Sequence, residues 1–529
     1  MGWVDGRKET SLTRGGNLSE GQPIRLTAEA EPAGVSRGHS SKPFKVYEGL
    51  NVKRKAEVTD SMSTYRQLKL PFGNPSQEIA VKLQRTAGKP NVSTASEHQK
   101  PHEPQEMHLM EQVVSNHIVG QALKRVETKG GKAPGIDGMK REELRTYLRT
   151  HWIEIKAQLL AGDYEPQPIR RVEIPKDGGG VRELGIPTML DRFIQQALLR
   201  VLNSIFDPTF SDNSFGFRPG RNQHHAIRRA QSHIQNGQTW TVDIDLSKFF
   251  DRVNHDMLMA RVARKVSDKR VLKLIRKYLE AGVMINGVVI DRDQGTAQGG
   301  PLSPLLSNIM LDDLDKELEK RGHSYVRYAD DFQIYVGSQK AGKRVMTSLT
   351  AYVENKLKLK INYNKSAIDK AWNRYYLGFG FYYRTKDEQV RIRLAPKTIQ
   401  KCKDRIREMT IRKNPTPMKT RIQQLNEYLT GWLIYYRIAD AKSHLEKIAG
   451  WIRRRLRMCL WKQWKLCKTK LRKLRGLGIA EDEARKMAFS RKGYWALSNT
   501  PQINKALGIK YWQTQGLIDL VPAYVAGRQ

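Results

Sequence analysis

Two adjacent acidic residues between β-prone runs constrain this chain more than any other feature. Asp330 and Asp331 stand between the largely apolar stretches 325–328 and 332–336. Acidic residues are common in turns, and the short runs on either side predict a hairpin with both carboxylates on one side of it. Alone, this pattern is equally typical of a solvated surface turn.

A second acidic pair changes that interpretation. Val242 and Ile244 alternate with Asp243 and Asp245, which predicts a strand with both carboxylates on the same face. Burying several carboxylates close together is costly unless cations neutralise them. Carboxylate oxygens suit Mg²⁺, and two such ions about 4 Å apart can support an in-line phosphoryl transfer. The two pairs together therefore favour a two-metal site over solvated acids.

The charge balance indicates a polyanionic partner. Lys and Arg number 93 against 54 Asp and Glu, a net charge of +39, and binding to phosphates is favoured by the release of their counterions. Nucleic acid is preferred over an anionic membrane because the sequence has neither an eighteen-residue apolar stretch nor an apolar run behind a basic N-terminus. Cys402, Cys459 and Cys467 form no C-x-x-C pair, so the cysteines indicate neither a zinc ribbon nor disulfides and suit a reducing cytoplasm.

The hydrophobic pattern divides the chain into regions of different character. Residues 1–61 have little periodic hydrophobicity and predict a disordered extension, which 62–104 links to the folded part. Helical spacing begins at 105–128 and recurs at 257–281. Between 130 and 385, short apolar strands alternate with helices, which predicts an α+β domain.

Basic helices are expected from 397 to the end. Apolar residues recur every three or four positions between Ile452 and Leu474, which predicts one amphipathic helix of about six turns. The stretch 451–475 holds eleven Lys and Arg and no acidic residue. We expect its apolar stripe to pack on protein and its other faces to bind phosphate.

Eight segments, in this order, resemble those of group II intron reverse transcriptases. The resemblance covers about 105–525, and Ser490–Ser498 in addition resembles the end of bacterial class C intron proteins. The eight segments are Lys132–Gly138, Ile174–Thr188, Phe215–Gly220, Asp245–Asp251, Gln298–Pro304, Tyr328–Asp331, Leu359–Ser366 and Leu377–Phe379.

The resemblance implies a right-hand polymerase of the α+β class. Fingers are expected at 105–240 and the palm at 241–390. A helical thumb, the maturase X domain, is expected at 391–475, and a small basic nucleic-acid-binding segment at 476–529.

The same resemblance implies which groups bind metal. The ligands are Asp245, Asp330 and Asp331, assisted by the backbone carbonyl of Leu246, and they hold two Mg²⁺ ions for which Mn²⁺ can substitute. Asp243 matches a variable position of the family motif and is expected to be a neighbour of the site.

Five side chains are implied at the incoming nucleotide. Lys176 and Arg182 flank a glycine-rich loop that can close over a triphosphate. Phe250 is expected to abut the sugar C2′ and select dNTPs, Gln298 to lie near the nucleotide or template, and Lys365 near the pyrophosphate. The simpler alternatives are solvated basic side chains and, for the phenylalanine, an ordinary core ring.

Contacts to nucleic acid are expected from the thumb onward. Arg491 and Lys492 precede Tyr494 and Trp495, a mixture of cations and rings that suits single strands or structured RNA. The other expected contacts are Arg437, Arg453, Arg454, Arg455 and Arg457. The adjacent His224 and His225 have no third ligand in sight and are interpreted as structural.

These expectations define a bacterial, cytoplasmic reverse transcriptase that also assists splicing. Its partners would be a group II intron RNA, an RNA template with a DNA primer, dNTPs and target DNA, with no membrane. The sequence has no segment of paired cysteines and histidines of the kind found in endonuclease domains, so no endonuclease domain is expected. The alternatives are an RNA-binding maturase with little polymerase activity and a host-adopted reverse transcriptase in defence or repair. Phe250 disfavours a polymerase that makes RNA.

Overall fold

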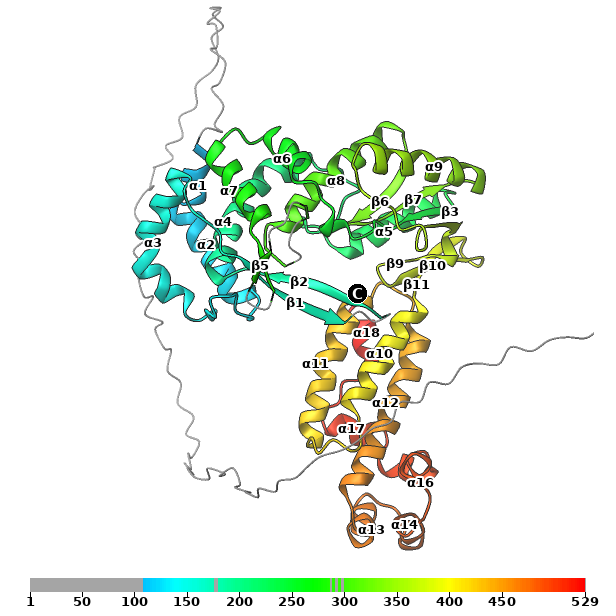
Figure 1. Ribbon diagram of the computed structural model, residues 1–529. Coiled ribbons are helices and arrows are strands. Elements are labelled where there is room, and N and C mark those ends of the chain that lie inside the picture. Colours follow the sequence, from blue (N-terminus) through cyan, green and yellow to red (C-terminus); the bar gives the residue numbers. More distant parts are fainter. Residues whose placement is uncertain (1–107, 176–178, 286–287, 291–293, 296–298, 529) are drawn as a thin grey trace, which may run out of the picture. The chain divides into compact units, whose positions relative to one another are not determined.

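The computed structural model describes residues 108–528 except 176–178, 286–287, 291–293 and 296–298. The expectations for 1–61 and 62–104 lie outside these residues. All described residues belong to one compact unit of the chain (Figure 1). Within them, none of the helices combines the length and the apolar character that crossing a bilayer requires.

The N-terminal helices bury an apolar face, but they are shorter than expected. The helix predicted at 105–128 is two helices, α1 (Leu109–Val113) and α2 (Asn116–Lys129). The prediction of one helix was wrong because Ser115 is extended, with ψ of 145°. Apolar spacing continues across such a break when both helices face the same core. Helix α3 (Leu144–Ala161) follows.

A four-stranded sheet follows in the predicted fingers. Strand β1 (Ile169–Pro175) pairs antiparallel with β2 (Val181–Ile186), from Arg170 opposite Ile186 to Pro175 opposite Val181. The other edge of β1 pairs in parallel with β4 (Val283–Ile285), which pairs with β5 (Val288–Ile290). The β1–β2 pairing is therefore between the segments that precede and follow the glycine-rich stretch in the sequence.

The second sheet has the order β6-β7-β3-β8. The two strands expected at 325–336 are confirmed as an antiparallel pair that continues onto the strand of Asp243. Alternate residues face two different cores, with Val242 and Ile334 in one and Val326 and Tyr335 in the other. The strands are β3 (Trp240–Ile244), β6 (Ser324–Tyr328), β7 (Asp331–Val336) and β8 (Ala367–Lys370).

The remaining elements of this part are helices around the sheets and a small third sheet of order β11-β10-β9. The helix expected at 257–281 is divided into α6 and α7, because Asp268 is extended and its side chain caps α7. The elements are α4 (Met189–Phe206), α5 (Gln223–Gln235), α6 (His255–Ala263), α7 (Lys269–Glu280), α8 (Ser303–Lys320), α9 (Gln339–Asn355), β9 (Tyr375–Tyr376), β10 (Phe379–Arg384) and β11 (Gln389–Leu394), with 3-10 turns at Asp207–Thr209, Phe249–Asp251 and Ala371–Asn373.

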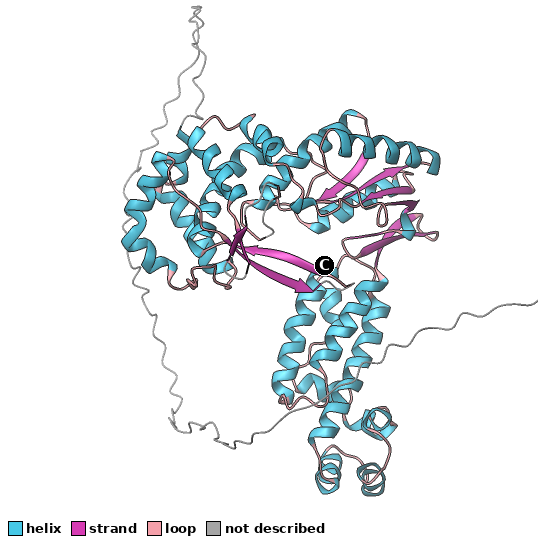
Figure 2. Ribbon diagram, viewed as in Figure 1, coloured by secondary structure: helices cyan, strands magenta, loops and turns pink. Residues whose placement is uncertain are grey.

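From residue 396 the described chain is helical (Figure 2). The single helix predicted at 451–475 was wrong. Helix α12 ends at Gln463, Lys465 has a φ of +41°, and α13 begins at Cys467 and packs against α14. The helices are α10 (Pro396–Met409), α11 (Met418–Tyr436), α12 (Lys442–Gln463), α13 (Cys467–Gly476), α14 (Glu481–Ala488), α15 (Tyr494–Leu497), α16 (Pro501–Ala506), α17 (Ile509–Thr514) and α18 (Leu520–Ala526).

Two hydrophobic cores hold these elements together. The first joins the N-terminal helices to one face of the β6-β7-β3-β8 sheet. The second joins the other face of that sheet, through α5, to the C-terminal helices. The expected α+β class is confirmed. The domain boundaries stay predictions, and α5, which falls in the expected fingers, packs against β6 of the expected palm.

Candidate active site

Acidic side chains from two parts of the sequence meet at one end of the β6-β7-β3-β8 sheet. Asp245 directly follows β3, and Asp330 and Asp331 lie at the turn between β6 and β7. Ile244 is paired with Phe332, so antiparallel pairing brings the two acidic positions to neighbouring points of the sheet. We call these three residues the acidic edge.

The β6–β7 turn is held in an unusual backbone conformation. Ala329 has a φ of +60°, in the left-handed region, and a Cβ on Gly216 would overlap the Ala329 amide. The loop at Phe215–Gly220 therefore requires glycine where it touches the turn. The Asn308 side-chain amide donates to the Gly216 carbonyl at 2.9 Å and fixes this contact.

A fully buried ion pair stabilises the β6–β7 turn. Arg327 and Asp315 are 0% exposed and their side chains are 2.5 Å apart. Arg327 Nη1 also donates to Asn308 Oδ1 at 3.0 Å and to the Ala329 carbonyl at 2.9 Å. Sequence reasoning missed this pair. The sequence feature that could have revealed the pair is an arginine within an apolar strand, together with an aspartate on the apolar side of the helix at 303–320.

The segment at 360–366 holds Asp245 by its backbone. The Asn362 amide donates to the Asp245 carbonyl at 2.8 Å, and the Asp245 amide donates to Ser366 Oγ at 3.0 Å. The Ser247 amide donates to the Lys360 carbonyl, so the Leu246 carbonyl takes no part in the bonds of this bridge.

The carboxylates of the acidic edge destabilise one another's charged forms. Desolvation, followed by the charges of Asp330 and Asp245, raises the pKa of Asp331 to about 6, although the residue keeps an open side toward solvent. Desolvation, and then Asp245, also raises the pKa of Asp330. A divalent cation with a preference for oxygen ligands would relieve both effects.

The donor chemistry of this set fits magnesium. Among the described residues, no three acidic, histidine or cysteine side chains are already gathered closely enough to enclose one ion. The fit therefore rests on oxygen donors that repel one another at a partly dehydrated site.

Asp243 has a different environment from the acidic edge. Its carboxylate lies 2.5 Å from the Arg374 guanidinium. Burial raises the pKa of Asp243, and the bond and charge of Arg374 oppose that rise. An aspartate already paired with arginine needs no metal, which agrees with its expected place beside the site.

The expected nucleotide contacts are partly described. Lys176 and Gln298 lie outside the described residues. Arg182 is exposed on β2, and its positive charge lowers the pKa of Asp330, against the larger effect of desolvation. Lys365 Nζ lies 3.7 Å from Asp245 Oδ2, so the Leu359–Ser366 segment brings a cation to the acidic edge.

Two further observations concern the nucleotide region. Phe249 is buried at 3% exposed, whereas Phe250 is half-buried and meets it edge to face at 5.2 Å. Both rings pack at the first core, and Phe250 is the more accessible of the two. Glu183 pairs with Arg171 at 2.5 Å across the regular β1–β2 hairpin.

Two protein-family models match this chain. The one described as reverse transcriptase (RNA-dependent DNA polymerase) matches residues 174–381, and the group II intron, maturase-specific domain matches 399–476. Protein YkfC of Escherichia coli is 36% identical over 281 residues, which are 46% of this chain and 74% of YkfC. The chain belongs to the group II intron reverse transcriptase family.

Two further proteins are similar over smaller shares of their length. The group II intron-encoded protein LtrA of Lactococcus lactis is 31% identical over 310 residues, 46% of this chain and half of LtrA. A chain of a solved Cas6-RT-Cas1–Cas2 complex is 27% identical over 50% of this chain and 46% of its own, at a TM-score of 0.31, which is too low for a statement about the fold.

The maturase-specific region of this family member uses some of its arginines internally. Arg457 is 7% exposed, its Nε donates to the Ser498 carbonyl at 2.7 Å, and its Nη1 donates to the Leu507 carbonyl at 3.3 Å. Desolvation lowers its pKa to about 10. The prediction that Arg457 contacts nucleic acid was therefore wrong. Arg455 is half-buried and donates to Thr410 Oγ1 at 2.6 Å, which is also a structural role.

Other predicted contacts in the C-terminal region remain accessible. The Arg454 guanidinium lies 3.8 Å from the ring centroid of Trp495, which is 38% exposed. Arg437, Arg491 and Lys492 are exposed, and Arg453 is half-buried.

An aromatic cluster joins the reverse transcriptase and maturase regions. Phe379 stacks on Tyr435 at 5.7 Å and also meets Tyr436, and His224 Nε2 lies 2.6 Å from the Tyr435 carbonyl. The structural interpretation of His224 agrees with this packing.

Proposed function

We propose that this chain is an RNA-directed DNA polymerase whose catalytic carboxylates are Asp245, Asp330 and Asp331. The observation that carries the proposal is the acidic edge, where partly dehydrated carboxylates from β3 and the β6–β7 turn raise the pKa of Asp331 to about 6. The matching reverse transcriptase family model supports the reaction class. Because the matched region spans only half of LtrA, the activity of the whole protein is part of the proposal.

The residues around the acidic edge have distinct roles in this proposal. Asp245, Asp330 and Asp331, with the Leu246 carbonyl, would hold two Mg²⁺ ions. When bound, such ions supply positive charge that favours loss of the primer 3′-hydroxyl proton and stabilises the pyrophosphate leaving group. The Arg327–Asp315 pair keeps the turn, and therefore the spacing of its carboxylates, rigid.

Positive and apolar side chains complete the nucleotide site. Arg182 and Lys365 bring positive charge to the acidic edge, where a triphosphate would be bound, and Lys176 is expected to join them. Phe250 presents a half-buried ring that would restrict the sugar to a deoxyribose. Gln298 is expected to contact the nucleotide or the template.

We infer a second activity, binding of a group II intron RNA so that the RNA splices. The maturase-specific match over α10 to α13 and the net charge of +39 support it. Arg437, Arg453, Arg454, Arg491 and Lys492 are the proposed contacts. Target DNA, dNTPs and a primed RNA template would be the other partners, in the cytoplasm of a bacterium.

Primer extension on an RNA template with Mg²⁺ and dNTPs tests the polymerase. The wild-type protein should extend a DNA primer and Asp330→Ala should not, because the variant loses one carboxylate of the edge. Asp482→Ala, at an exposed acid on α14, is the matched control and should extend normally. A folded but inactive wild-type protein that still binds RNA in a salt-sensitive way would favour an RNA-binding maturase instead.

A further inference from the structure

A pocket rich in arginine lies where the second core brings α5, β11 and the C-terminal end of the described chain together. Its volume is about 470 Å³. Four arginines and one aspartate line it, which leaves an excess of three positive charges. The arginines come from separate elements: Arg228 from α5, Arg391 from β11, Arg437 from the turn after α11, and Arg528 from the turn after α18.

Two of these arginines are neutralised by neighbouring acids. Arg528 lies 2.9 Å from Asp440, and Arg391 lies 3.8 Å from the same carboxylate while it also pairs with Asp387. The Tyr382 hydroxyl donates to Asp440 at 2.9 Å, which further holds the carboxylate in place. On this side of the pocket the arginine charges are therefore paired with acidic side chains.

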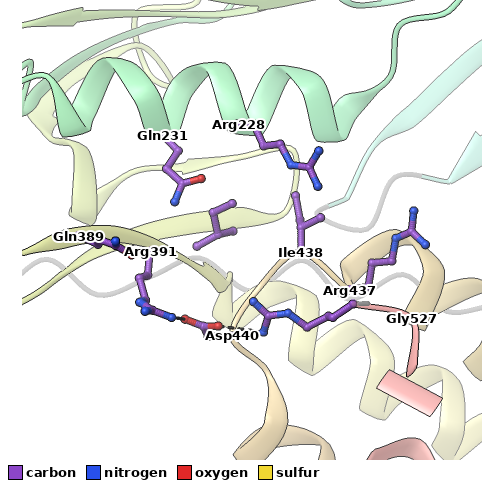
Figure 3. A pocket seen from close by; sticks show the side chains of 10 residues that line it. Arg228, Gln231, Gln389, Arg391, Arg437, Ile438, Asp440 and Gly527 are labelled. Atoms are coloured by element: carbon purple, nitrogen blue, oxygen red, sulfur yellow. Dashed lines mark hydrogen bonds and ion pairs between the residues drawn. The ribbon is translucent and has the colours of Figure 1, made fainter. Parts of the chain in front are cut away.

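The other two arginines have no such partner among the described residues. Arg228 and Arg437 are exposed, and no acidic side chain in the described chain lies within ion-pair distance of either. Figure 3 shows both side chains at the pocket, Arg228 on α5 and Arg437 next to Ile438 on the turn after α11. Two unpaired guanidinium groups thus approach one hollow from different elements.

We propose that this pocket binds a phosphodiester group of a nucleic-acid backbone, with Arg228 and Arg437 as the contacting cations. Guanidinium groups bind phosphate oxygens through paired hydrogen bonds, which suits a single phosphate held between two arginines. Both arginines are exposed and the chain carries a net charge of +39, conditions that favour a long polyanion over a neutral ligand.

The proposal deepens the proposed function, on which it rests, by assigning one phosphate of the bound nucleic acid to a defined place away from the acidic edge. RNA and DNA present the same phosphodiester, so the structure defines the chemistry of the ligand, and the experiment separates the two sources. The pocket joins α5, next to the palm sheet, to the maturase region. A phosphate bound there would contact both regions at once.

Salt-dependent binding tests the proposal. The probe is a fluorescein-labelled RNA hairpin and, in a parallel arm, a DNA hairpin of the same sequence. The logarithm of affinity is measured against the logarithm of salt concentration for wild type and for Arg228→Gln/Arg437→Gln. One lost phosphate contact should reduce the slope by about 0.7 to 0.9 and weaken binding at low salt by about tenfold.

Two further double variants separate the pocket from general charge. Arg149→Gln/Arg344→Gln removes two exposed arginines on α3 and α9 and should change the slope by less than half as much. Arg228→Lys/Arg437→Lys keeps the charge but loses the paired donors, so it should retain the slope and lose part of the affinity. Thermal unfolding confirms that each variant is folded.

Each outcome has a defined meaning. A slope change confined to the RNA arm or the DNA arm identifies the source of the phosphate. Equal effects of the pocket variant and the α3/α9 variant, or an unchanged slope, would overturn the pocket while leaving wild-type primer extension as the test of the polymerase. Absent wild-type extension together with the expected slope change would overturn the proposed polymerase and retain the pocket.

Discussion

The acidic edge and helix α12 both contain charged groups whose pKa is shifted by desolvation, but the surroundings of those charges differ. At the acidic edge, desolvation and neighbouring carboxylates raise the pKa of Asp331 to about 6, and Lys365 Nζ lies 3.7 Å from Asp245 Oδ2. On α12, desolvation lowers the pKa of Arg457 to about 10, but two backbone carbonyls accept hydrogen bonds from its guanidinium.

The difference separates a binding site from a structural contact. A buried charge whose hydrogen bonds are satisfied within the chain needs no external partner. A group of carboxylates that repel one another is stabilised when a cation arrives. In our proposal a bound cation would stabilise the acidic edge, whereas Arg457 ties α12 to the C-terminal helices.

The largest expected effect separates Asp245 from its neighbour on the same strand face. Asp245→Asn should lower primer extension by about 10³-fold, roughly 4 kcal/mol of transition-state stabilisation, because a carboxylate of the edge is lost. Asp243→Asn should lower it by less than about tenfold, because Arg374 already neutralises that carboxylate. Steady-state extension rates at saturating Mg²⁺ measure both. Equal losses would show that Asp243 belongs to the acidic edge.

An effect on stability is expected at Arg457. Arg457→Met keeps most of the side-chain volume and leaves the carbonyls of Ser498 and Leu507 without a donor, so we expect a loss of about 2–3 kcal/mol in unfolding free energy. Arg491→Met, at an exposed position, should change it by less than about 0.5 kcal/mol. Urea unfolding compares them. Similar stabilities would mean that water replaces the lost donor.

The smallest expected effect is the pH dependence caused by Asp331. Its folded pKa is raised, so its proton stabilises the metal-free fold below the unfolded pKa, and this contribution is lost as the pH rises through about 6. Asp331→Asn should stabilise the metal-free protein at pH 7 by about 1 kcal/mol, after allowance for solvent screening, and should have no such effect near pH 3.

Melting temperatures of wild type and Asp331→Asn between pH 3 and 8, without divalent ions, measure this effect. Adding Mg²⁺ at pH 7 should stabilise the wild type and narrow the gap between them. Polymerase activity should fall at acidic pH, since a protonated Asp331 is a poor metal ligand, and raising the Mg²⁺ concentration should move this fall to lower pH because bound cations favour the ionised carboxylate. If the melting temperatures of wild type and Asp331→Asn changed in parallel with pH, the raised pKa would not belong to Asp331.

Local pattern was sufficient for some elements and insufficient for others. The hairpin at 325–336 was predicted because β-prone runs and turn residues lie within a few positions of one another. The helices at 105–128, 257–281 and 451–475 were each predicted as one and are each two. Apolar spacing persists through a turn when both helices face the same core, so the pattern contains no signal of the break.

The sequence alone determined the family, the α+β class and the acidic residues, since these depend on residue types in a fixed order. Only the tertiary structure decided what each charge does. Asp243 pairs with Arg374, which is 131 positions away, and Arg457 meets carbonyls 41 and 50 positions away. Contacts between residues so distant in sequence form only when the helices and strands that carry them pack together. The same packing leaves Arg228 and Arg437 facing one pocket and brings Asp245 to the β6–β7 turn.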